Sequence, residues 1–298
     1  MTGGSVSRTQ AWMMACRPRT LTATIAPVAA GTGLAHMHGG FALLPALAAL
    51  AAAVLIQVGT NLANDYYDYQ KGGDSEGRLG PVRVTQAGLI EGRDVLRGAF
   101  LAFALATGAG VFLALVAGWP VVAIGVASIA AGVAYTAGPW PLAYHGLGDL
   151  FVFVFFGLVA VAGTCFVQVL EFRPDSLTAG VALGASSTAI LVVNNLRDIK
   201  TDARAGKRTL AVRIGGGWTK VQYVLLVVLT AVIPPAGMAL HGWSPWVLLS
   251  LCALAAVAGP LKLVLDHREP AVLNRALAGT ARFVGLFGVL LGLGFALG

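Results

Sequence analysis

The sequence predicts an all-α membrane protein, a multispanning bundle of nine transmembrane helices. Of its 298 residues, 57% are hydrophobic and 11% are charged, and the mean hydropathy is +0.79. This composition is typical of a chain that lies mostly in a lipid bilayer. The apolar residues form continuous runs and not ten-residue segments of alternating polarity, which argues against a transmembrane β-barrel.

The apolar runs are long enough to cross the roughly 30 Å hydrocarbon core, which needs about 20 helical residues. The expected spans are residues 11–36, 42–64, 98–117, 119–137, 147–170, 176–196, 219–240, 243–264 and 278–297. Two long polar insertions lie between them, at 65–97 and 197–218, and the other connections are short turns. We therefore predict a single transmembrane domain over residues 1–298, with function concentrated in the two insertions.

The basic residues predict the orientation. An odd number of spans places the chain ends on opposite faces, and all 20 Lys and Arg residues except Arg173 then fall on the face of the N-terminus. Because Lys and Arg collect on the cytoplasmic side, we expect a cell-membrane protein with its N-terminus and both insertions in the cytoplasm and its C-terminus outside. The net charge of +7 lies in short loops beside spans, which favours membrane lipids and an anionic substrate over nucleic acid as partners.

Two sets of acidic and amide side chains stand at the cytoplasmic ends of the second and sixth spans. They comprise Asn61, Asn64, Asp65, Asp68 and Asp74 in the first insertion, and Asn194, Asn195, Asp198 and Asp202 in the second. Because helical neighbours recur every three or four residues, we expect Asn61, Asp65 and Asp68 to share one face and the second set to form a matching stripe. The two acidic faces then look at each other across a cavity.

These spaced acids predict a magnesium site. An isolated acid at a helix end is usually solvated, but ionisable groups beside the hydrocarbon are costly and typically face a bundle interior. Mg²⁺ commonly binds one or two carboxylates plus substrate phosphates. The expected catalytic metal ligands are Asp65, Asp68, Asp198 and Asp202, with Asp74 as a further ligand.

Basic and amide groups beside the acids predict the rest of a diphosphate site. The bases neutralise the phosphate charge that the metal leaves, and the asparagines either orient the carboxylates or touch the phosphates directly. The expected diphosphate-binding residues are Asn61, Asn64, Lys71, Arg78, Arg83, Asn194, Asn195, Arg197, Lys207 and Arg208. For the bases, ordinary positive charge of cytoplasmic loops is the alternative interpretation.

A smaller polar group lies near residues 135–149. It consists of Tyr135, Tyr144, His145 and Asp149. Its members, Tyr144 and His145 above all, either stabilise the Gly-Pro-rich turn or contact an aromatic acceptor, and the sequence leaves both open. His36 and His38 are expected on the outer face, where no acid stands near them in the sequence, so we expect no metal site there.

The sequence around these residues resembles the UbiA superfamily of intramembrane aromatic prenyltransferases, and within it the 1,4-dihydroxy-2-naphthoate polyprenyltransferases. The resemblance is carried by NLANDYYDYQKGGDSEGRLGPVRVTQAGLI and NNLRDIKTDARAGKRTLAVRIG, and extends through RPRT at 17–20, YTAGPWPLAYHGLGD at 135–149 and LNRALAGTAR at 273–282. One departure is that Asp74 stands six residues after Asp68, wider than is usual in the superfamily.

The resemblance implies a UbiA-type fold of nine helices and a Mg²⁺-dependent reaction. A polyprenyl chain passes from polyprenyl diphosphate to 1,4-dihydroxy-2-naphthoate, with loss of carbon dioxide and diphosphate, giving demethylmenaquinol for menaquinone synthesis. Two alternatives stay open. One is a related enzyme with another acceptor, such as 4-hydroxybenzoate, homogentisate or a haem vinyl group. The other is a transporter of divalent cations or anionic metabolites, although a transporter typically places its acids near mid-bilayer.

Overall fold

The computed structural model describes residues 6–72 and 79–298, and its secondary structure there is helical, with no β-strand. Asp74 and Arg78, two of the predicted site residues, lie outside this part. The helices are α1 (Arg8–Cys16), α2 (Thr22–Met37), α3 (Leu43–Gln70), α4 (Gly92–Ala117), α5 (Trp119–Ala134), α6 (Gly148–Phe153), the π-helical η3 (Val154–Val159), α7 (Ala160–Val169), α8 (Pro174–Arg204), α9 (Leu210–His241), the 3₁₀-helical η4 (Pro245–Ala253), α10 (Leu254–Asp266) and α11 (Leu273–Ala296). Short 3₁₀ turns are η1 (Pro18–Thr20), η2 (Leu142–His145) and η5 (Pro270–Val272).

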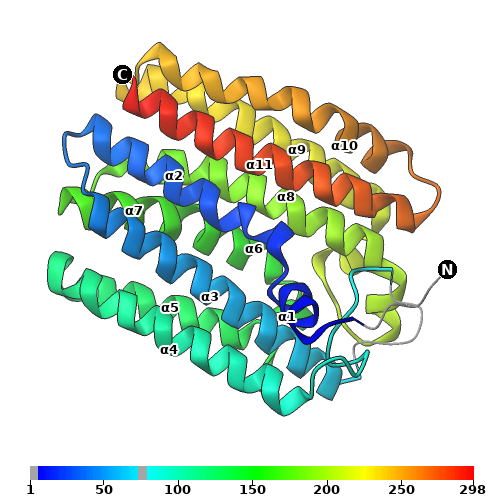
Figure 1. Ribbon diagram of the computed structural model, residues 1–298. Helices are drawn as coiled ribbons and strands as arrows, with labels where there is room; N and C mark the ends of the chain where they lie inside the picture. Colours follow the sequence, from blue (N-terminus) through cyan, green and yellow to red (C-terminus); the bar gives the residue numbers. More distant parts are fainter. Residues whose placement is uncertain (1–5, 73–78) are drawn as a thin grey trace.

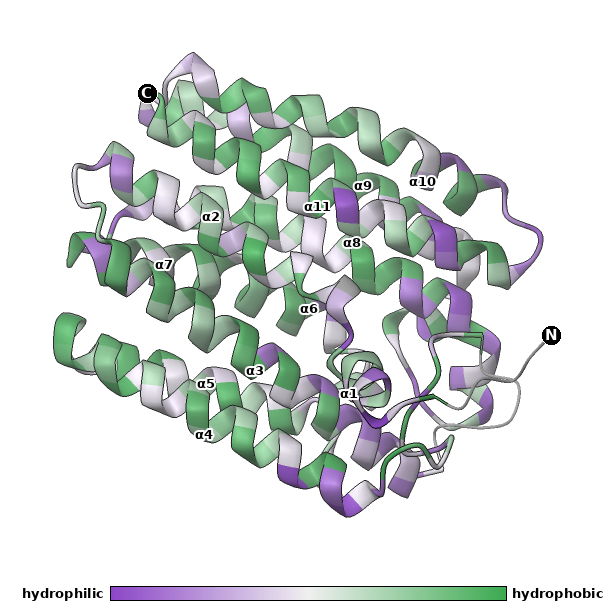
Figure 2. Cartoon of the chain, in the orientation of Figure 1, coloured by the Kyte–Doolittle hydropathy of each residue, from purple (hydrophilic) through white to green (hydrophobic). Residues whose placement is uncertain are grey.

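The long helices form an elongated bundle of rods running side by side (Figure 1). Within the described ranges there are nine rods, because α6, η3 and α7 follow one another without a break, as do η4 and α10. Seven rods are long and apolar enough to cross a membrane, and α5 is a shorter apolar helix. Hydrophobic residues cover the rods, while hydrophilic residues gather at the end of the bundle where α1 lies (Figure 2). The predicted multispanning helical bundle is confirmed.

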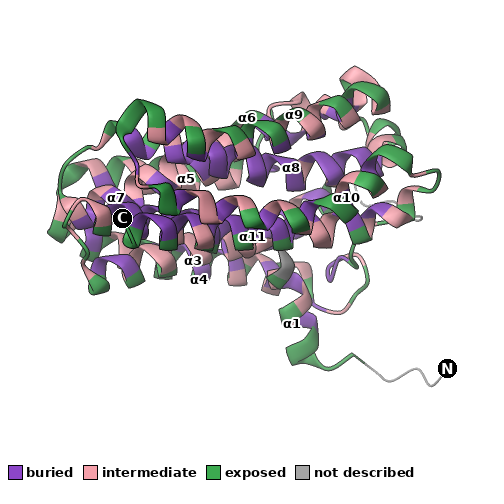
Figure 3. Ribbon diagram, turned by 90° about the horizontal axis from the view of Figure 1, so that it is seen from above, coloured by how far each residue is buried: buried purple, intermediate pink, exposed green. Residues whose placement is uncertain are grey.

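The first predicted span, 11–36, is wrong as a single helix. Arg17 adopts a left-handed conformation with φ of 52°, which ends α1. Pro18 follows, and it has no amide hydrogen with which to continue a helix. A capping box between Ser7 and Gln10 starts α1 as a helix of its own, and α1 projects from the bundle (Figure 3).

Other helices extend beyond the predicted spans. α3 runs to Gln70 and α8 to Arg204, so the described members of both acidic sets lie on helices and not on loops. α4 and α9 also begin earlier than predicted, at Gly92 and Leu210. The predicted spans stop where the apolar residues stop, whereas the helices continue into the polar insertions.

The larger of two groups of packed helices shares one buried apolar cluster, to which α2, α7, α8, α9, η4, α10 and α11 contribute. α8 is its central helix. It contacts α9, α6, α7, α11 and α2. In its apolar stretch of 18 residues, 78% of the residues are buried (Figure 3). Small residues bring α2 and α11 together: a Cβ on Gly33 would lie 2.0 Å from the carbonyl oxygen of Gly292. Such close backbone contact is a common way for membrane helices to associate without a hydrophobic driving force.

A smaller packed group joins α1, α3, α4 and the segment before α4. Its buried core contains Leu62, Val84, Val95 and Phe103. Val84 and Ile90 anchor the segment between α3 and α4, which would otherwise be a polar loop. The two packed groups leave a space between them, and the candidate site lies there.

At the opposite end of the bundle, His38 contacts an acid that lies far from it in the sequence. His38 Nε2 lies 3.0 Å from Asp175 Oδ2, and Trp243 Nε1 donates to the same oxygen at 3.2 Å. An acid therefore does stand beside His38, although it is far away in the sequence. The contact ties the end of α2 to the start of α8.

Candidate active site

A cavity of about 760 Å³ lies between the two packed groups, with one polar end and a long apolar body. The polar end is lined by Asn61, Asn64 and Asp68 of α3, Asn194, Asn195, Asp198 and Asp202 of α8, and also Arg83, Tyr144 and Lys207. The apolar body is formed by α3, α4, α5 and the α6–η3–α7 rod. Lining residues on α3 run from Ala49 to Asp68, a rise of about 28 Å at 1.5 Å per residue, close to the roughly 30 Å apolar thickness of a bilayer.

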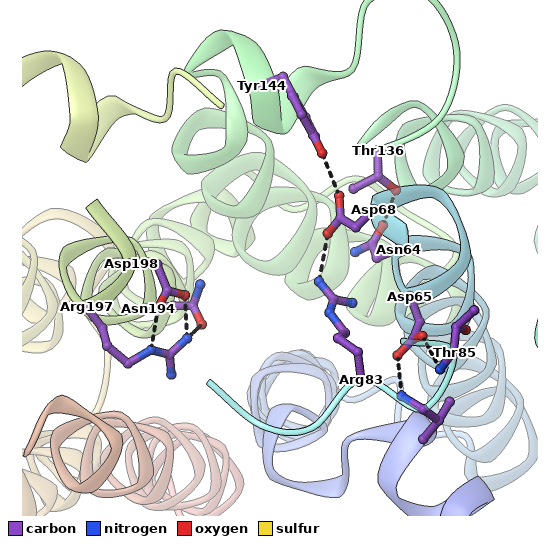
Figure 4. Close-up of polar contacts among 11 residues, drawn as sticks. Asn64, Asp65, Asp68, Arg83, Thr85, Thr136, Tyr144, Asn194, Arg197 and Asp198 are labelled. Carbon is purple, nitrogen blue, oxygen red and sulfur yellow. Dashed lines mark hydrogen bonds and ion pairs between the residues drawn. The ribbon is translucent and has the colours of Figure 1, made fainter. Parts of the chain in front are cut away.

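The two acidic faces stand on opposite sides of the polar end (Figure 4). Asp68 comes from α3 and Asp198 from α8, and Arg83 lies between the two sets in this view. The expectation that two stripes face one cavity therefore agrees with the structure for these residues. Among the residues described, no three His, Cys, Asp or Glu side chains form a ready-made metal cluster.

Asp68 is the most closely held acid of the first set. Its Oδ2 accepts a hydrogen bond from Arg83 Nη2 at 2.7 Å, and its Oδ1 accepts one from Tyr144 Oη at 3.1 Å. Both Asp68 and Arg83 side chains are 5% exposed. The carboxylate is thus fixed at the cavity wall by a cation and a phenol from two other segments.

Asp65 faces a different way from the other predicted ligands. Its Oδ1 accepts the backbone N–H of Thr85 at 3.1 Å, and its Oδ2 that of Val84 at 3.3 Å. Asp65 is 1% exposed and does not line the cavity. In this arrangement its carboxylate holds the segment that carries Arg83 (Figure 4) and is not directed at a metal in the cavity.

The α8 set is organised by a pair of adjacent residues. Arg197 Nε donates to Asp198 Oδ1 at 2.8 Å, and Arg197 Nη2 donates to Asp198 Oδ2 at 2.5 Å. The same guanidinium donates to Asn194 at 2.9 Å and to Asn274 of α11 at 2.8 Å. Asp198 and Asn194 line the cavity, whereas Arg197 lies behind them. Arg197 therefore orients the acid from behind and is not placed to touch a cavity ligand.

The remaining predicted residues of α3 connect it to its neighbours. Asn61 Nδ2 donates to the carbonyl of Cys16 at 3.1 Å, and Asn64 Oδ1 accepts from Thr136 at 2.6 Å. Lys71 Nζ donates to the carbonyl oxygens of Thr136 and Gly138, so it caps the turn after α5 at the rim of the site. Asn61 and Asn64 line the cavity and Lys71 does not.

Tyr144 collects positive charge around the polar end. The ammonium nitrogens of Lys71 and Lys207 each lie 5.4 Å from the centre of its ring, within the range of a cation–π contact. Lys207 also lines the cavity. The hypothesis that Tyr144 belongs to the site thus fits its position, although it contacts Asp68 and the lysines through its own hydroxyl and ring.

His145 and Arg208 are not brought to the cavity. His145 Nδ1 lies 2.9 Å from the carbonyl oxygen of Pro141. Its ring stacks on that of Trp140, with 4.2 Å between the ring centres. Of the two interpretations of His145, the structure favours the one in which its side chain stabilises the Gly-Pro-rich turn. The backbone N–H of Arg208 donates to the carbonyl of Tyr144, and its side chain is not part of the lining.

Sequence reasoning missed several lining residues. Arg17, Thr20 and Thr136 belong to the polar end. They stand in the stretches RPRT and YTAGPWPLAYHGLGD that carry the family resemblance, but no spacing of acids marks them as site residues. Arg17 reaches the site because its left-handed conformation turns the chain between α1 and α2. The signal available was its place before Pro18, which interrupts the first apolar run. Tyr135, one of the polar group near residues 135–149, also lines the cavity.

The chain resembles known proteins over most of its length. A model of the UbiA prenyltransferase family matches residues 24–295. The chain is 44% identical over 252 residues to a 1,4-dihydroxy-2-naphthoate octaprenyltransferase of Mycobacterium tuberculosis, covering 85% of this chain and 83% of the relative. It is 35% identical over 303 residues to a protein of the same name from Escherichia coli, covering 100% and 98%.

Solved structures share the fold at low sequence identity. A UbiA homolog from Aeropyrum pernix superposes with a TM-score of 0.68 at 13% identity, covering 92% of this chain and 97% of the other. A UbiA homolog from Archaeoglobus fulgidus bound to DMAPP and Mg²⁺ gives 0.62 at 14% identity, covering 94% and 98%.

Proposed function

The chain belongs to the UbiA prenyltransferase family, and from that premise we propose that it transfers a polyprenyl chain from polyprenyl diphosphate to 1,4-dihydroxy-2-naphthoate. Carbon dioxide and diphosphate leave, and the product is the demethylated quinol of menaquinone synthesis. The choice of acceptor rests on relatives that share this name and cover nearly the whole chain.

The observation that carries the proposal is the two-part cavity. Its polar end holds carboxylates, amides and cations, and its apolar body continues for about the depth of a bilayer. An amphiphile with an anionic head and a long hydrocarbon tail matches both parts at once. A transporter for small ions has no use for so long an apolar chamber.

The donor set at the polar end suits Mg²⁺, which prefers oxygen ligands and often completes its coordination with waters and phosphates. Asp68, Asp198 and Asp202 line the cavity and would hold the metal, which stabilises the charge of a departing diphosphate when bound. Asp65 is left out of this ligand set because its carboxylate faces backbone amides. The Archaeoglobus relative in fold binds DMAPP together with Mg²⁺.

The chain's own cations assist the same step. Arg83 and Lys207 line the polar end and supply positive charge where the diphosphate oxygens gain negative charge as the allylic C–O bond breaks. The apolar walls exclude water, which would otherwise capture the allylic cation. Asn64, Asn194 and Asn195 supply amide groups at the same end.

The open side of the cavity supplies a route for the tail. Val122 and Val126 of α5 line the cavity and are 52% and 63% exposed. We place the polar end at the cytoplasmic face, because nearly all basic residues collect there. The diphosphate and the acceptor then enter from the cytoplasm, and the tail enters sideways from the lipid.

The test is an assay of purified protein in lipid nanodiscs, with one polyprenyl diphosphate and Mg²⁺. Dihydroxynaphthoate, 4-hydroxybenzoate and homogentisate are supplied in turn. We expect prenylated quinol from dihydroxynaphthoate alone, none in excess EDTA, and none from Asp68→Asn. Transfer to another acceptor, or full turnover in EDTA, would contradict the acceptor or the metal respectively.

A further inference from the structure

A second, much smaller cavity lies beside the polar end of the first. Its volume is about 10 Å³, which is the space that one water molecule needs. Tyr135, Asn195 and Lys207 line both cavities and form the wall between them. Asp149, at the start of α6, lines the small cavity only.

Asp149 is a buried acid with one oxygen unused. It is 7% exposed, and its Oδ1 accepts a hydrogen bond from Gln222 of α9 at 3.1 Å. Its Oδ2 is buried and accepts no hydrogen bond from any described residue. A buried carboxylate oxygen without a donor is unfavourable and is uncommon in native proteins. The small cavity beside it has room for the missing donor.

Tyr135 connects this acid with the main cavity. A Cβ placed on Gly148 would lie 3.0 Å from Tyr135 Oη, so the phenol hydroxyl sits against the backbone next to Asp149. A neutral phenol can accept one proton while it donates another, so Tyr135, which lines both cavities, can pass a proton between them.

We propose that Tyr135, one water molecule and Asp149 form a proton relay for the hydroxyl group of the aromatic acceptor. This inference rests on the proposed function and adds a role that the acidic sets cannot fill. A ring attacks a cation faster when its hydroxyl is losing a proton. Asp68 and Asp198 are already paired with Arg83 and Arg197, whereas Asp149 lines the small cavity and its Oδ2 accepts no hydrogen bond from any described residue.

The step balances without any further reagent. The acceptor hydroxyl gives its proton to Tyr135, whose own proton passes through the water to Asp149 Oδ2. The ring carbon that bears the carboxylate bonds to the allylic carbon, while the allylic C–O bond breaks and its electron pair leaves with diphosphate. This gives a ketone next to a carboxylate. When carbon dioxide leaves, the electron pair of the broken C–C bond returns to the ring oxygen, which takes the proton back along the relay.

A purely structural role for Asp149, tying α6 to α9 through Gln222, makes a different prediction. Asp149→Asn is matched in size and keeps an oxygen for Gln222, but cannot take up a proton. We expect it to fold, to bind polyprenyl diphosphate with KM within about twofold of the parent, and to lose at least about a hundredfold in kcat. Tyr135→Phe should also lower kcat, without changing KM for the diphosphate.

Two readouts separate the relay from a general loss of structure. In the parent protein kcat should fall at low pH as Asp149 takes up a proton, and this fall should be absent from the residual activity of Asp149→Asn. The other ionisable groups at the small cavity are Tyr135 and Lys207, with Arg213 beside Gly146 on its wall. Exchange of bridging and terminal ¹⁸O in the prenyl diphosphate measures C–O cleavage alone, and it should continue in Asp149→Asn.

The matched control is Asp175→Asn, the same change on an equally buried acid at the far end of the bundle. We expect it to lower the unfolding temperature and leave kcat within about twofold. Asp149→Asn keeping more than a third of parental kcat, or losing oxygen exchange together with turnover, would overturn the relay. If the parent itself exchanges oxygen but prenylates no dihydroxynaphthoate, the acceptor assignment fails instead.

Discussion

Arg83 reaches back fifteen positions to hold Asp68, with 2.7 Å between its Nη2 and the carboxylate Oδ2, while two backbone amides beside Arg83 are held by Asp65. Two acids of α3 thus hold one short segment, residues 83–85. Asp68 pairs with the side chain at the cavity, and Asp65 fixes the backbone behind it. Their similar positions in the sequence conceal different tasks, and the tasks can be separated experimentally.

Replacing Asp65 should weaken substrate binding without weakening metal binding. In Asp65→Asn one of the two oxygen acceptors becomes an amide donor that faces a backbone N–H, at a cost of roughly 1.5–3 kcal/mol. We expect KM for polyprenyl diphosphate to rise about tenfold or more as the Arg83 segment loosens, with the half-saturating Mg²⁺ concentration unchanged. Asp68→Asn, the matched control, should abolish activity or raise that Mg²⁺ concentration. A raised Mg²⁺ requirement in Asp65→Asn would make Asp65 a metal ligand after all.

Removing Arg197 should destabilise the fold, because it leaves the buried Asp198 carboxylate without its bidentate partner. Breaking one partner of a buried pair costs about 3–5 kcal/mol, so the unfolding temperature of Arg197→Met should fall by several degrees or more. The double variant Arg197→Met/Asp198→Leu should regain most of that stability and remain inactive. Arg204→Met, at an exposed position on the same helix, serves as the control and should unfold like the parent. An Arg197→Met variant that unfolds at the parental temperature would contradict this account.

Tyr144→Phe should have a moderate effect. The substitution removes the hydroxyl that donates to Asp68 at 3.1 Å but keeps the ring beside Lys71 and Lys207. Loss of one hydrogen bond to a charged group, about 1.5–3 kcal/mol, should lower kcat/KM by roughly tenfold to a hundredfold. Tyr144→Leu removes the ring as well and should be worse, chiefly through KM for the diphosphate. Equal activity of Tyr144→Phe and the parent would mean that the hydroxyl does not position Asp68.

The contact of α2 with α11 should tolerate no side chain at Gly33. Even the methyl group of Gly33→Ala would lie 2.0 Å from the carbonyl oxygen of Gly292, so the helices must separate. Gly108→Ala, on α4, adds the same methyl group where nothing lies within 4 Å, and should be neutral or stabilising by up to about 1 kcal/mol. Thermal unfolding in detergent compares the two. Equal unfolding temperatures would mean that the bundle repacks freely at α2 and α11.

The orientation can be read from thiol labelling in sealed vesicles. In a background without Cys16, Cys165 and Cys252, Ala203→Cys should react with an impermeant reagent from the cytoplasmic side only, and bound diphosphate should slow the reaction. Glu171→Cys, at the other end of the bundle, should react from the outside only. Both residues are exposed. The reverse pattern would invert the topology and the proposed route of substrate entry.

Helical periodicity could predict the acidic faces but not the orientation of every residue on them. At about 100° per residue, Asn61 and Asp68 lie within about 20° of each other, while Asn64 and Asp65 fall on either side of that line. The spacing alone therefore could not decide which of the two faces the cavity. In the structure Asn64 lines the cavity and Asp65 does not, because the segment around Val84 packs on the other side of α3 and supplies backbone donors to Asp65.

Contacts between distant segments were beyond the reach of the sequence. Arg83 could be predicted as a phosphate-binding cation from its place in the first insertion, but its pairing with Asp68 depends on how that insertion folds. Asp149 and Gln222 carry no motif, and their contact exists only because α6 and α9 both pack on α8. The multispanning helical bundle, in contrast, follows from the length and polarity of the apolar runs.

The pairing of Asp68 with Arg83 and of Asp198 with Arg197 also bears on how the chain enters the membrane. Each acid finds its cation within its own half of the sequence, and Asp65 is satisfied by the backbone of the same insertion. When the first half has been synthesised, α8 does not yet exist, so its residues could not neutralise any charge. Because each half can pair its own buried charges, the early helices can settle in the bilayer before the later ones arrive. The cavity, whose polar end needs residues of both α3 and α8, can be completed only when the second half joins the first.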